Sequence, residues 1–266
     1  MRQKRILSAH PSRIVITRIA QITDLHLLPP GELLMDLDVN ERLQRVLDHA
    51  AAREPDAYFI TGDCCAMEPL QDVFYRLRPR LDALGKPYYI TPGNHDDRRM
   101  LRNAFYLDGH GDEPIKGLVR VNNRNFLFLD TCPARVDEEQ VEWLAAALAE
   151  YPEADLVMHH PPVPLGVNFM DTKYPLQDTD ALLDVLLGTD QPRRVFCGHF
   201  HSGRTVQHGP LEVHLCPPTS FFIDPEPEDF HQEFLPPAYL WLEWAEDGSF
   251  RAAPTFVASS PGKQRA

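Results

Sequence analysis

The sequence predicts an α/β fold over most of a 266-residue chain. Short apolar, β-branched runs recur along it, segments with helical spacing of apolar residues lie between them, and a polar motif follows several of the runs. Alternation of strand, loop and helix through about residue 200 is typical of sheets covered by helices. The chain is long enough to bury a substantial core, and we expect one domain because no linker-like stretch separates the polar motifs.

Five apolar runs predict strands that end where polar motifs begin. They are Ile14 to Ile22, Tyr58 to Ile60, Tyr88 to Ile90, Leu156 to Met158 and Val195 to Cys197. Open α/β sheets carry their functional groups in loops at strand ends, so we expect these motifs to meet there. Val119 to Val121 and Phe126 to Leu129 flank residues 122–125 and predict a hairpin. After His201 the pattern changes to short β runs, Leu211 to Leu215 and Tyr239 to Trp244.

Apolar side chains at helical spacing predict three helices between the strands. They cover Val39 to Glu54, Val141 to Leu148 and Thr179 to Leu187. Asp38 with Glu41, and Asp137 with Gln140, have the spacing of a capping box, in which each side chain bonds the backbone of the other residue. Gly188 is placed to end the third helix.

We expect the domain to occupy residues 13–258, with disordered ends at residues 1–12 and 259–266. The first residues are basic and then apolar, but Pro11, Arg13 and Arg18 interrupt the run before a signal-peptide core can form. The acidic, proline-rich stretch from Asp224 to Pro237 is predicted to be a surface loop or a contact with a partner, which leaves a homo-oligomer open.

Composition limits the partners. A formal net charge of -13 disfavours a nucleic-acid polymer or an anionic membrane, because both require a cationic face. No apolar run approaches the length that spans a membrane. The five cysteines form an odd set without CxxC spacing, which favours reduced thiols and a cytoplasmic location.

Side chains of metal-ligand type gather in five short blocks that follow the predicted strands. The blocks are Asp24-Leu25-His26, Gly62-Asp63, Gly93-Asn94-His95-Asp96, His159-His160-Pro161-Pro162 and Gly198-His199-Phe200-His201. Each block alone has an ordinary alternative, such as a solvated turn, a helix cap or a packed histidine. Five blocks in one order are harder to explain by chance.

The residue types favour two metal ions. A carboxylate such as that of Asp63 can bridge two cations, with one oxygen on each, and Asn94 offers a neutral carbonyl oxygen. Paired histidines suit Fe, Mn or Zn better than Mg or Ca, which prefer oxygen ligands. The blocks together indicate a dinuclear site that attacks phosphate esters. A small phosphate ester is compatible with the acidic chain because bound cations reverse the local potential.

These blocks resemble the signature of the calcineurin-like metallophosphoesterases, which reads D-x-H, G-D, G-N-H-D/E, a histidine after a later strand, and G-H-x-H. The similarity covers roughly residues 14–255. Within that superfamily the chain is most similar to bacterial class III cyclic-nucleotide phosphodiesterases and glycerophosphodiesterases. The segments that carry this likeness are Gly93 to Arg98, Leu129 to Thr131, His159 to Gly166 and Pro218 to Phe221. The resemblance implies a four-layer α/β/β/α sandwich, with two mixed sheets flanked by helices.

The resemblance also implies roles for residues. One ion would be held by Asp24, His26, Asp63 and His201, and the other by Asp63, Asn94, His159 and His199. A hydroxide shared by the two ions would attack phosphorus in line with the leaving oxygen. His95 would stabilise the transition state or protonate that oxygen. Asn168, Phe169, Met170 and Asp171 are expected, by analogy with the family, to cap the site and help select the ester, and His160 either contacts substrate or has a structural role.

The implied enzyme is a phosphodiesterase acting on a small diester, with a 3',5'-cyclic nucleotide such as cyclic AMP as the leading substrate. A glycerophosphodiesterase or a broad-specificity phosphomonoesterase with the same site stays open, and so does a non-catalytic scaffold on this fold. Two segments depart from the family pattern: Cys64 to Glu68, beside the expected bridging Asp63, and the shortened loop Cys132 to Arg135.

Overall fold

The computed structural model describes residues 16–189 and 191–258. The predicted disordered ends, residues 1–12 and 259–266, lie outside the described residues. Two mixed sheets form the centre of the molecule, and a two-stranded sheet lies beside them. The strand orders are β13-β12-β1-β2-β3, β4-β5-β6-β7-β9-β8 and β10-β11. In the first large sheet β1, β2 and β3 run parallel, and in the second β5, β6, β7 and β9 do so.

The strands carry the motifs at their ends. Their bounds are β1 Ile16–Ile22, β2 Ala57–Thr61, β3 Tyr88–Thr91, β4 Gly117–Val121, β5 Arg124–Phe128, β6 Asp155–Val157, β7 Arg193–Cys197, β8 Arg204–His208, β9 Leu211–Leu215, β10 Phe222–Ile223, β11 Gln232–Glu233, β12 Ala238–Ala245 and β13 Phe250–Phe256. The helices are α1 Val39–Ala51, α2 Gln71–Asp82, α3 Arg98–Phe105, α4 Glu138–Glu150, α5 Asn168–Lys173 and α6 Asp180–Leu187.

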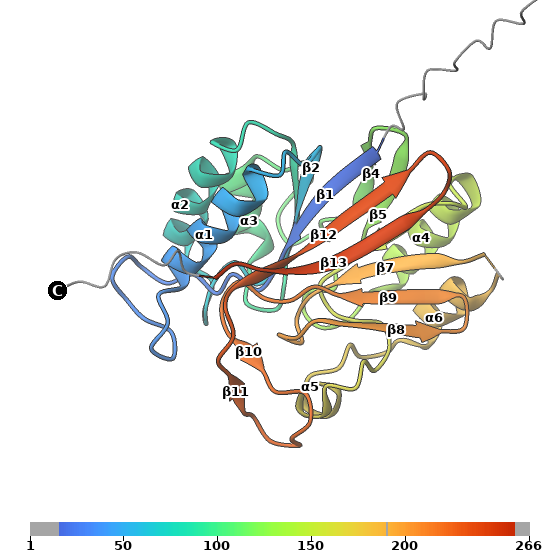
Figure 1. Cartoon of the computed structure of the whole chain (residues 1–266). Helices are drawn as coiled ribbons and strands as arrows, with labels where there is room; N and C mark the ends of the chain where they lie inside the picture. Colours follow the sequence, from blue (N-terminus) through green and yellow to red (C-terminus); the bar gives the residue numbers. More distant parts are fainter. Residues whose placement is uncertain (1–15, 190, 259–266) are drawn as a thin grey trace, which may run out of the picture.

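Three hydrophobic clusters show that the molecule has four layers. In β2, Tyr58 and Ile60 pack with α1, α2 and α3, whereas Phe59 points the other way, into a cluster between the two sheets. In β5, Phe126 joins that same central cluster, while Leu127 packs with α4 and α6. Figure 1 shows α1 to α3 on one side of the sheets and α4 and α6 on the other. The predicted four-layer α/β/β/α sandwich is confirmed.

The predicted helix starts are confirmed, but the reciprocal half of each capping box is wrong. Asp38 accepts a hydrogen bond from the backbone N–H of Glu41 at 2.9 Å, and Asp137 accepts one from Gln140 at 2.8 Å. The side chain of Gln140 does not return to Asp137. It is buried and bonds both the N–H and the C=O of Asp130, at 3.1 and 2.9 Å, and so ties α4 to the end of β5.

Three helices, α2, α3 and α5, were not predicted. α2 has Pro79 near its end and many charged residues, yet Val73, Phe74, Leu77 and Leu81 lie on one buried face. α3 begins with Asp97 as its cap, which accepts a hydrogen bond from Met100 N–H at 2.8 Å.

The predicted hairpin is formed by β4 and β5, with a shorter turn of Asn122 and Asn123 because Arg124 already pairs with Val121.

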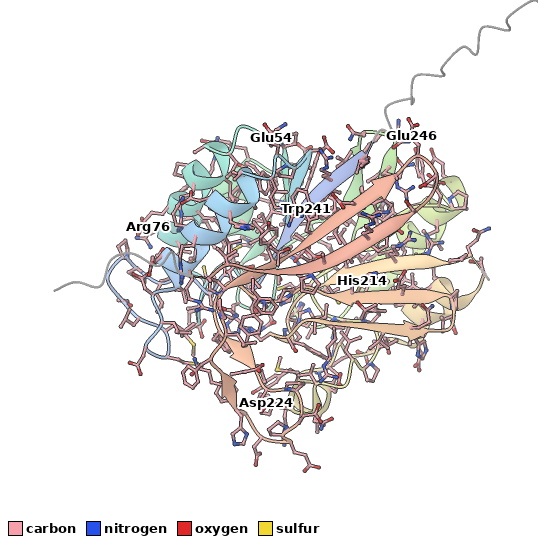
Figure 2. All side chains as sticks on the ribbon, viewed as in Figure 1. Glu54, Arg76, His214, Asp224, Trp241 and Glu246 are labelled. Carbon is pink, nitrogen blue, oxygen red and sulfur yellow. The ribbon has the colours of Figure 1, made fainter. Side chains whose placement is uncertain are left out.

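The predicted surface loop from Asp224 to Pro237 lies mainly at the periphery, and it contains the short strand β11, which pairs with β10. Figure 2 shows Asp224 at the lower edge of the molecule, in the same region as α5 in Figure 1. The backbone N–H of Asn168 in α5 donates to the C=O of Pro225 at 3.0 Å. Among the described residues, no helix is long and apolar enough to cross a membrane.

Candidate metal centre

Most of the predicted metal ligands lie just beyond the ends of central strands, in an unusual backbone conformation. Five of them have positive φ angles: Asp24 (51°), His26 (43°), Asp63 (50°), His199 (75°) and His201 (50°). Non-glycine residues seldom adopt this left-handed region, and each instance costs about 1–3 kcal/mol when the conformation is strained. Such strain gathers at functional sites, so its repetition here marks the strand ends as one.

The glycines of two motifs permit a close approach to these ligands. A Cβ atom on Gly93 would lie 2.2 Å from Oδ1 of Asp63. A Cβ atom on Gly198 would lie 2.0 Å from Oγ1 of Thr23 and 2.9 Å from Oδ2 of Asp24. Any larger residue would displace a carboxylate, and the motif glycines therefore have a steric role in the site.

The four side chains predicted to hold the first ion lie together. One ligand atom from each, of Asp24, His26, Asp63 and His201, lies within 4.8 Å of all the others. All four residues are buried. Asp24, which follows β1, is held by the loop after β7, because its carboxylate accepts the backbone N–H of His199 at 3.0 and 3.1 Å. Burial raises the pKa of Asp24 to about 7.

Two histidines of this group present lone pairs to each other. Nδ1 of His26 lies 3.1 Å from the C=O of Ala66, and Nδ1 of His201 lies 2.8 Å from the C=O of Phe221. Since a carbonyl only accepts, each Nδ1 carries the proton and each Nε2 carries a lone pair. The two Nε2 atoms are 3.0 Å apart. Burial lowers the pKa of His26 to about 4, which keeps the ring neutral. Converging lone pairs and carboxylates fit a cation.

Asp63 joins this group to a second set of histidines. Its Oδ2 lies 3.5 Å from Nε2 of His26 and 3.3 Å from Nε2 of His159. Nδ1 of His159 lies 2.7 Å from the C=O of Thr61, which leaves Nε2 for Asp63. Burial opposes a charge on His159, but the Asp63 carboxylate overcomes it and the pKa of His159 rises to about 9. The proton on His159 places a positive charge at the position that a metal ion would take, and binding of the ion would displace this proton.

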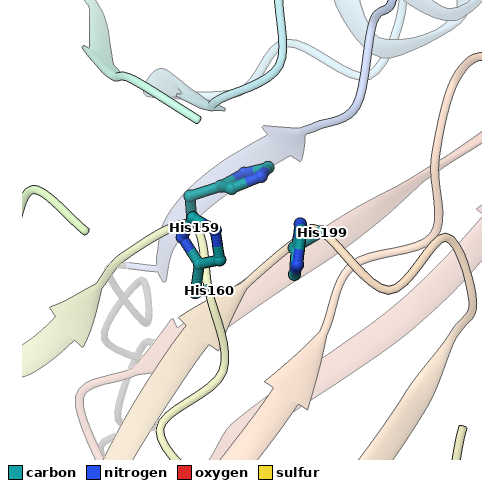
Figure 3. A group of neighbouring side chains, drawn as sticks. All are labelled: His159, His160 and His199. Atoms are coloured by element: carbon teal, nitrogen blue, oxygen red, sulfur yellow. The ribbon is translucent and has the colours of Figure 1, made fainter. Parts of the chain in front are cut away.

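The second group contains His159 and His199 of the predicted set and brings His160 beside them. His159, His160 and His199 place one ligand atom each within 4.8 Å of one another, as Figure 3 illustrates. His160 was expected only as a substrate contact or a structural residue. Its Nδ1 lies 2.8 Å from Oγ1 of Thr131, and its buried Nε2 has no hydrogen-bond partner. Asn94 is exposed and lines the cavity next to Asp63.

His95 also lines this cavity. Its backbone N–H donates to Oδ1 of Asp63 at 2.9 Å. Its Nδ1 lies 2.8 Å from the C=O of Met67, so that nitrogen donates and Nε2 is left for another partner. The ring centre of His95 is 5.0 Å from that of His26. His95 is thus beside the predicted ligands and oriented by the backbone.

Asp96 belongs to the block Gly93 to Asp96, but the sequence assigned it no role, and the structure gives it a structural one. Its buried carboxylate accepts backbone N–H groups of Cys64 at 2.9 Å, Cys65 at 3.3 Å and Gly93 at 3.0 Å. It therefore joins the loop that carries Asp63 to the loop that carries Asn94. At Cys64 and Cys65 the sequence departs from the family pattern, but these residues contact Asp96 through their backbone N–H groups. Both thiols are free and buried.

Five of the seven predicted ligands form one side of a cavity of about 440 Å³. The lining residues include His26, Asp63, Asn94, His95, His199 and His201. A larger cavity, of about 850 Å³, lies between β3, α3 and β4 and is lined by none of the predicted ligands. We assign the chemistry to the smaller cavity, because the buried histidines and carboxylates converge there.

Two predicted substrate contacts have their polar groups engaged elsewhere. Nδ2 of Asn168 donates to the C=O of Glu226 at 2.7 Å. The carboxylate of Asp171 accepts the backbone N–H groups of Leu165, Gly166 and Val167 at 2.7–2.9 Å. Asp171 lines a neighbouring cavity instead of this one. Between them, Phe169 and Met170 do line the 440 Å³ cavity.

Known proteins resemble this chain in sequence and in fold. Residues 17–203 match the family described as calcineurin-like phosphoesterase. A 3',5'-cyclic adenosine monophosphate phosphodiesterase of Pseudomonas aeruginosa is 30% identical over 86% of each chain. A probable glycerophosphodiester phosphodiesterase of Arcobacter nitrofigilis is 24% identical, over 92% of this chain and 94% of its own.

Among solved structures, a dimetal phosphatase from Danio rerio superimposes with a TM-score of 0.63. It covers 91% of this chain and 99% of its own length at 14% sequence identity, and so it supports the fold alone. The family match extends over most of the chain and includes all five motif blocks from Asp24 to His201. The chain belongs to the calcineurin-like phosphoesterase family and is a phosphoric ester hydrolase.

Proposed function

We propose that this protein is a dinuclear metal-dependent phosphodiesterase that hydrolyses a small diester, with a 3',5'-cyclic nucleotide such as cyclic AMP as its substrate. The observation that carries the proposal is the position of Asp63. Its carboxylate lies between two groups of buried ligands, 3.5 Å from His26 and 3.3 Å from His159. A carboxylate with nitrogen ligands on both sides suits a bridge between two ions.

Residues for two ions are at hand. Asp24, His26, Asp63 and His201 would hold the first, and Asp63, Asn94, His159 and His199 the second. Mixed nitrogen and oxygen ligands favour Fe, Mn or Zn. When bound, two such ions supply a water that loses its proton near neutral pH, and they offset negative charge on the phosphate oxygens. The family and the buried donor set support the proposal.

His95 is the proposed proton donor to the leaving oxygen. Its backbone and Nδ1 are fixed by Asp63 and Met67, so the ring has one orientation at the edge of the cavity. Because the C=O of Met67 holds Nδ1–H, Nε2 has a proton to donate only when the ring is an imidazolium, and Nε2–H is then the group that would reach the leaving oxygen. General acid catalysis of this kind contributes about 10²- to 10⁴-fold to a rate. Loss of His95 would therefore lower kcat without removing the ligands.

The choice of cyclic AMP as substrate is supported by the relative from Pseudomonas aeruginosa, which is named a 3',5'-cyclic adenosine monophosphate phosphodiesterase. The relative of Arcobacter nitrofigilis is named for glycerophosphodiesters and supports the second candidate, a glycerophosphodiesterase with the same site. A non-catalytic scaffold is disfavoured because the seven ligand types are retained in the sequence together with His95.

The test is metal analysis of the purified protein followed by turnover assays with cyclic AMP, glycerophosphodiesters, a generic diester and a generic monoester. We expect cyclic AMP to be cleaved with the highest kcat/KM. Asp63→Asn should lose metal and lower turnover at least 100-fold, whereas Asp184→Asn, at an exposed position on α6, should match the wild type. Metal-loaded protein that cleaves no diester, or Asp63→Asn with full activity, would contradict the proposal.

A further inference from the structure

The cavity has two chemically different sides. The histidines and Asp63 form one, and apolar side chains form the other. The apolar lining residues are Met35, Phe169, Met170, Tyr174, Phe221, Ile223 and Phe230. Cavities that bind small molecules are mostly apolar with a few placed polar groups, and about 440 Å³ is within their usual size range. The apolar side is therefore positioned to contact the organic part of an ester whose phosphate faces the ligands.

Four rings make a continuous surface on this side, which we call the aromatic wall: Phe169, Tyr174, Phe221 and Phe230. The ring centres of Phe169 and Tyr174 are 5.6 Å apart, those of Phe169 and Phe230 are 5.9 Å apart, and those of Phe221 and Phe230 are 6.2 Å apart. Each pair meets at 65–69°. This edge-to-face packing joins the rings to one another, and all four residues line the cavity.

Two of these rings are exposed beyond what a core requires. Tyr174 is 53% exposed and Phe230 is 40% exposed. Large exposed apolar groups that gather at a cavity indicate a binding surface, since burying them on a ligand is favourable. The wall has little hydrogen-bonding capacity, because Tyr174 alone among the described apolar lining residues carries a side-chain hydroxyl.

The wall is fixed relative to the metal ligands at both ends. His201 bonds the C=O of Phe221 at 2.8 Å, and its ring stacks on Phe221 with centres 4.1 Å apart. His199 bonds the C=O of Tyr174 at 2.9 Å through Nε2. Asn168 also ties α5 to the segment that carries Phe230, through the C=O of Glu226. The distance from ligands to wall is thus set by the fold before any substrate binds.

We propose that the aromatic wall is the specificity-determining surface of this site, and that it selects esters carrying a planar aromatic group by stacking that group on its ring faces. This inference rests on the proposed function. The planar group would be the base of a nucleotide. Because the wall offers ring faces and few hydrogen-bond partners, it should discriminate weakly between purine bases and strongly against substituents without a flat face.

A glycerol group has no flat face and would gain little from such a surface. A quaternary ammonium group can also contact aromatic rings. An aromatic box around a cation needs several exposed ring faces, whereas only Tyr174 and Phe230 of these four residues are exposed, and this favours a planar group. A choline-containing diester is therefore the discriminating rival.

The test uses adenosine, which has the base but no phosphate, as a competitor. Metal-loaded protein is assayed with cyclic AMP, a generic diester and glycerophosphocholine, each in the presence of adenosine, ribose or inorganic phosphate. We expect adenosine to inhibit competitively and ribose not to. Stacking on an aromatic ring contributes about 1–3 kcal/mol per base. Phe230→Ala should accordingly weaken adenosine inhibition about tenfold, equivalent to about 1.4 kcal/mol, and raise KM for cyclic AMP similarly.

Three readouts should stay within twofold in Phe230→Ala: kcat, bound metal and inhibition by inorganic phosphate. Phe234→Ala is the matched control, because Phe234 is 80% exposed and does not line the cavity. It should match the wild type throughout. An unchanged KM in Phe230→Ala, or a loss confined to glycerophosphocholine, would overturn the inference.

Failure of the proposed function is recognisable separately. A protein that cleaves the generic diester but no cyclic nucleotide would refute that function. Adenosine inhibition of the generic reaction that weakens in Phe230→Ala would still support the wall. Absence of adenosine inhibition in an enzyme that does cleave cyclic AMP would refute the wall alone.

Discussion

The two sides of the cavity are built in opposite ways. The ligand cluster, which comprises Asp24, His26, Asp63, His159, His199 and His201, is buried, rests on central strands and accepts strained backbone at most of its positions. The aromatic wall comes from α5 and from the segments around β10, near the periphery, and Tyr174 and Phe230 are half-exposed there. The chemistry is thus fixed by the core, and selectivity lies where residues change at little cost to the fold.

The largest effect should come from adding one methyl group at Gly198, beside the ligand cluster. Gly198→Ala would force a Cβ against Thr23 and Asp24 and displace a ligand. A displacement of about 1 Å can lower a rate 10²-fold, so we expect at least that loss of kcat/KM, with reduced metal content. Gly203→Ala is the control, since its Cβ would meet Pro217 at an ordinary 3.6 Å. Equal activity of the two variants would refute the steric role of Gly198.

Metal affinity should depend on pH through the ligand cluster. The Asp63 carboxylate raises the pKa of His159 to about 9, so at pH 7 this ring holds a proton that metal must displace. The pKa of His26 is lowered to about 4, so this ring is already neutral. Affinity should therefore rise about tenfold per pH unit from pH 7 to 9 and level off above. At pH 8, where Asp24 with its pKa of about 7 is already ionised, calorimetry in buffers of different ionisation enthalpy should show about one proton released, and a flat affinity profile would contradict this.

Asp96→Asn should weaken the support beneath the ligand cluster. The new amide N–H₂ would face backbone donors such as Gly93 N–H, which now bond the carboxylate. Leaving a buried donor unsatisfied costs about 1–3 kcal/mol, and we expect that decrease in the free energy of unfolding by denaturant titration. Asp97→Asn is the control, because asparagine caps a helix as well as aspartate does. If both variants have the same free energy of unfolding, the hydrogen bonds of the Asp96 carboxylate do not stabilise the site.

The smallest effect should come from the support of the aromatic wall. Asn168→Ala removes one hydrogen bond to Glu226 C=O, and a neutral bond contributes about 0.5–1.5 kcal/mol. We expect KM for cyclic AMP to rise about threefold, with unchanged metal content. Asn103→Ala, at an exposed position on α3, should change neither quantity. A loss of metal in Asn168→Ala would show that cluster and wall are not separable.

The same contrast explains what could be predicted from sequence. Ligands such as Asp63 and His201 follow apolar strands within short, ordered motifs, so both the fold and the ligand cluster were accessible. Phe221 and Phe230 belong to no periodic pattern, and their approach to Phe169 depends on tertiary packing. Likewise α2 and α3 carry many charged residues, so their buried faces are difficult to recognise in the sequence.

The most direct test of the account is anomalous diffraction from crystals grown with Mn. We expect two peaks about 3.5–4 Å apart, the usual spacing of two-metal sites, on either side of the Asp63 carboxylate. One peak should lie beside His26 and His201 and the other beside His159 and His199. A single peak, or peaks that do not contact Asp63, would contradict the dinuclear centre.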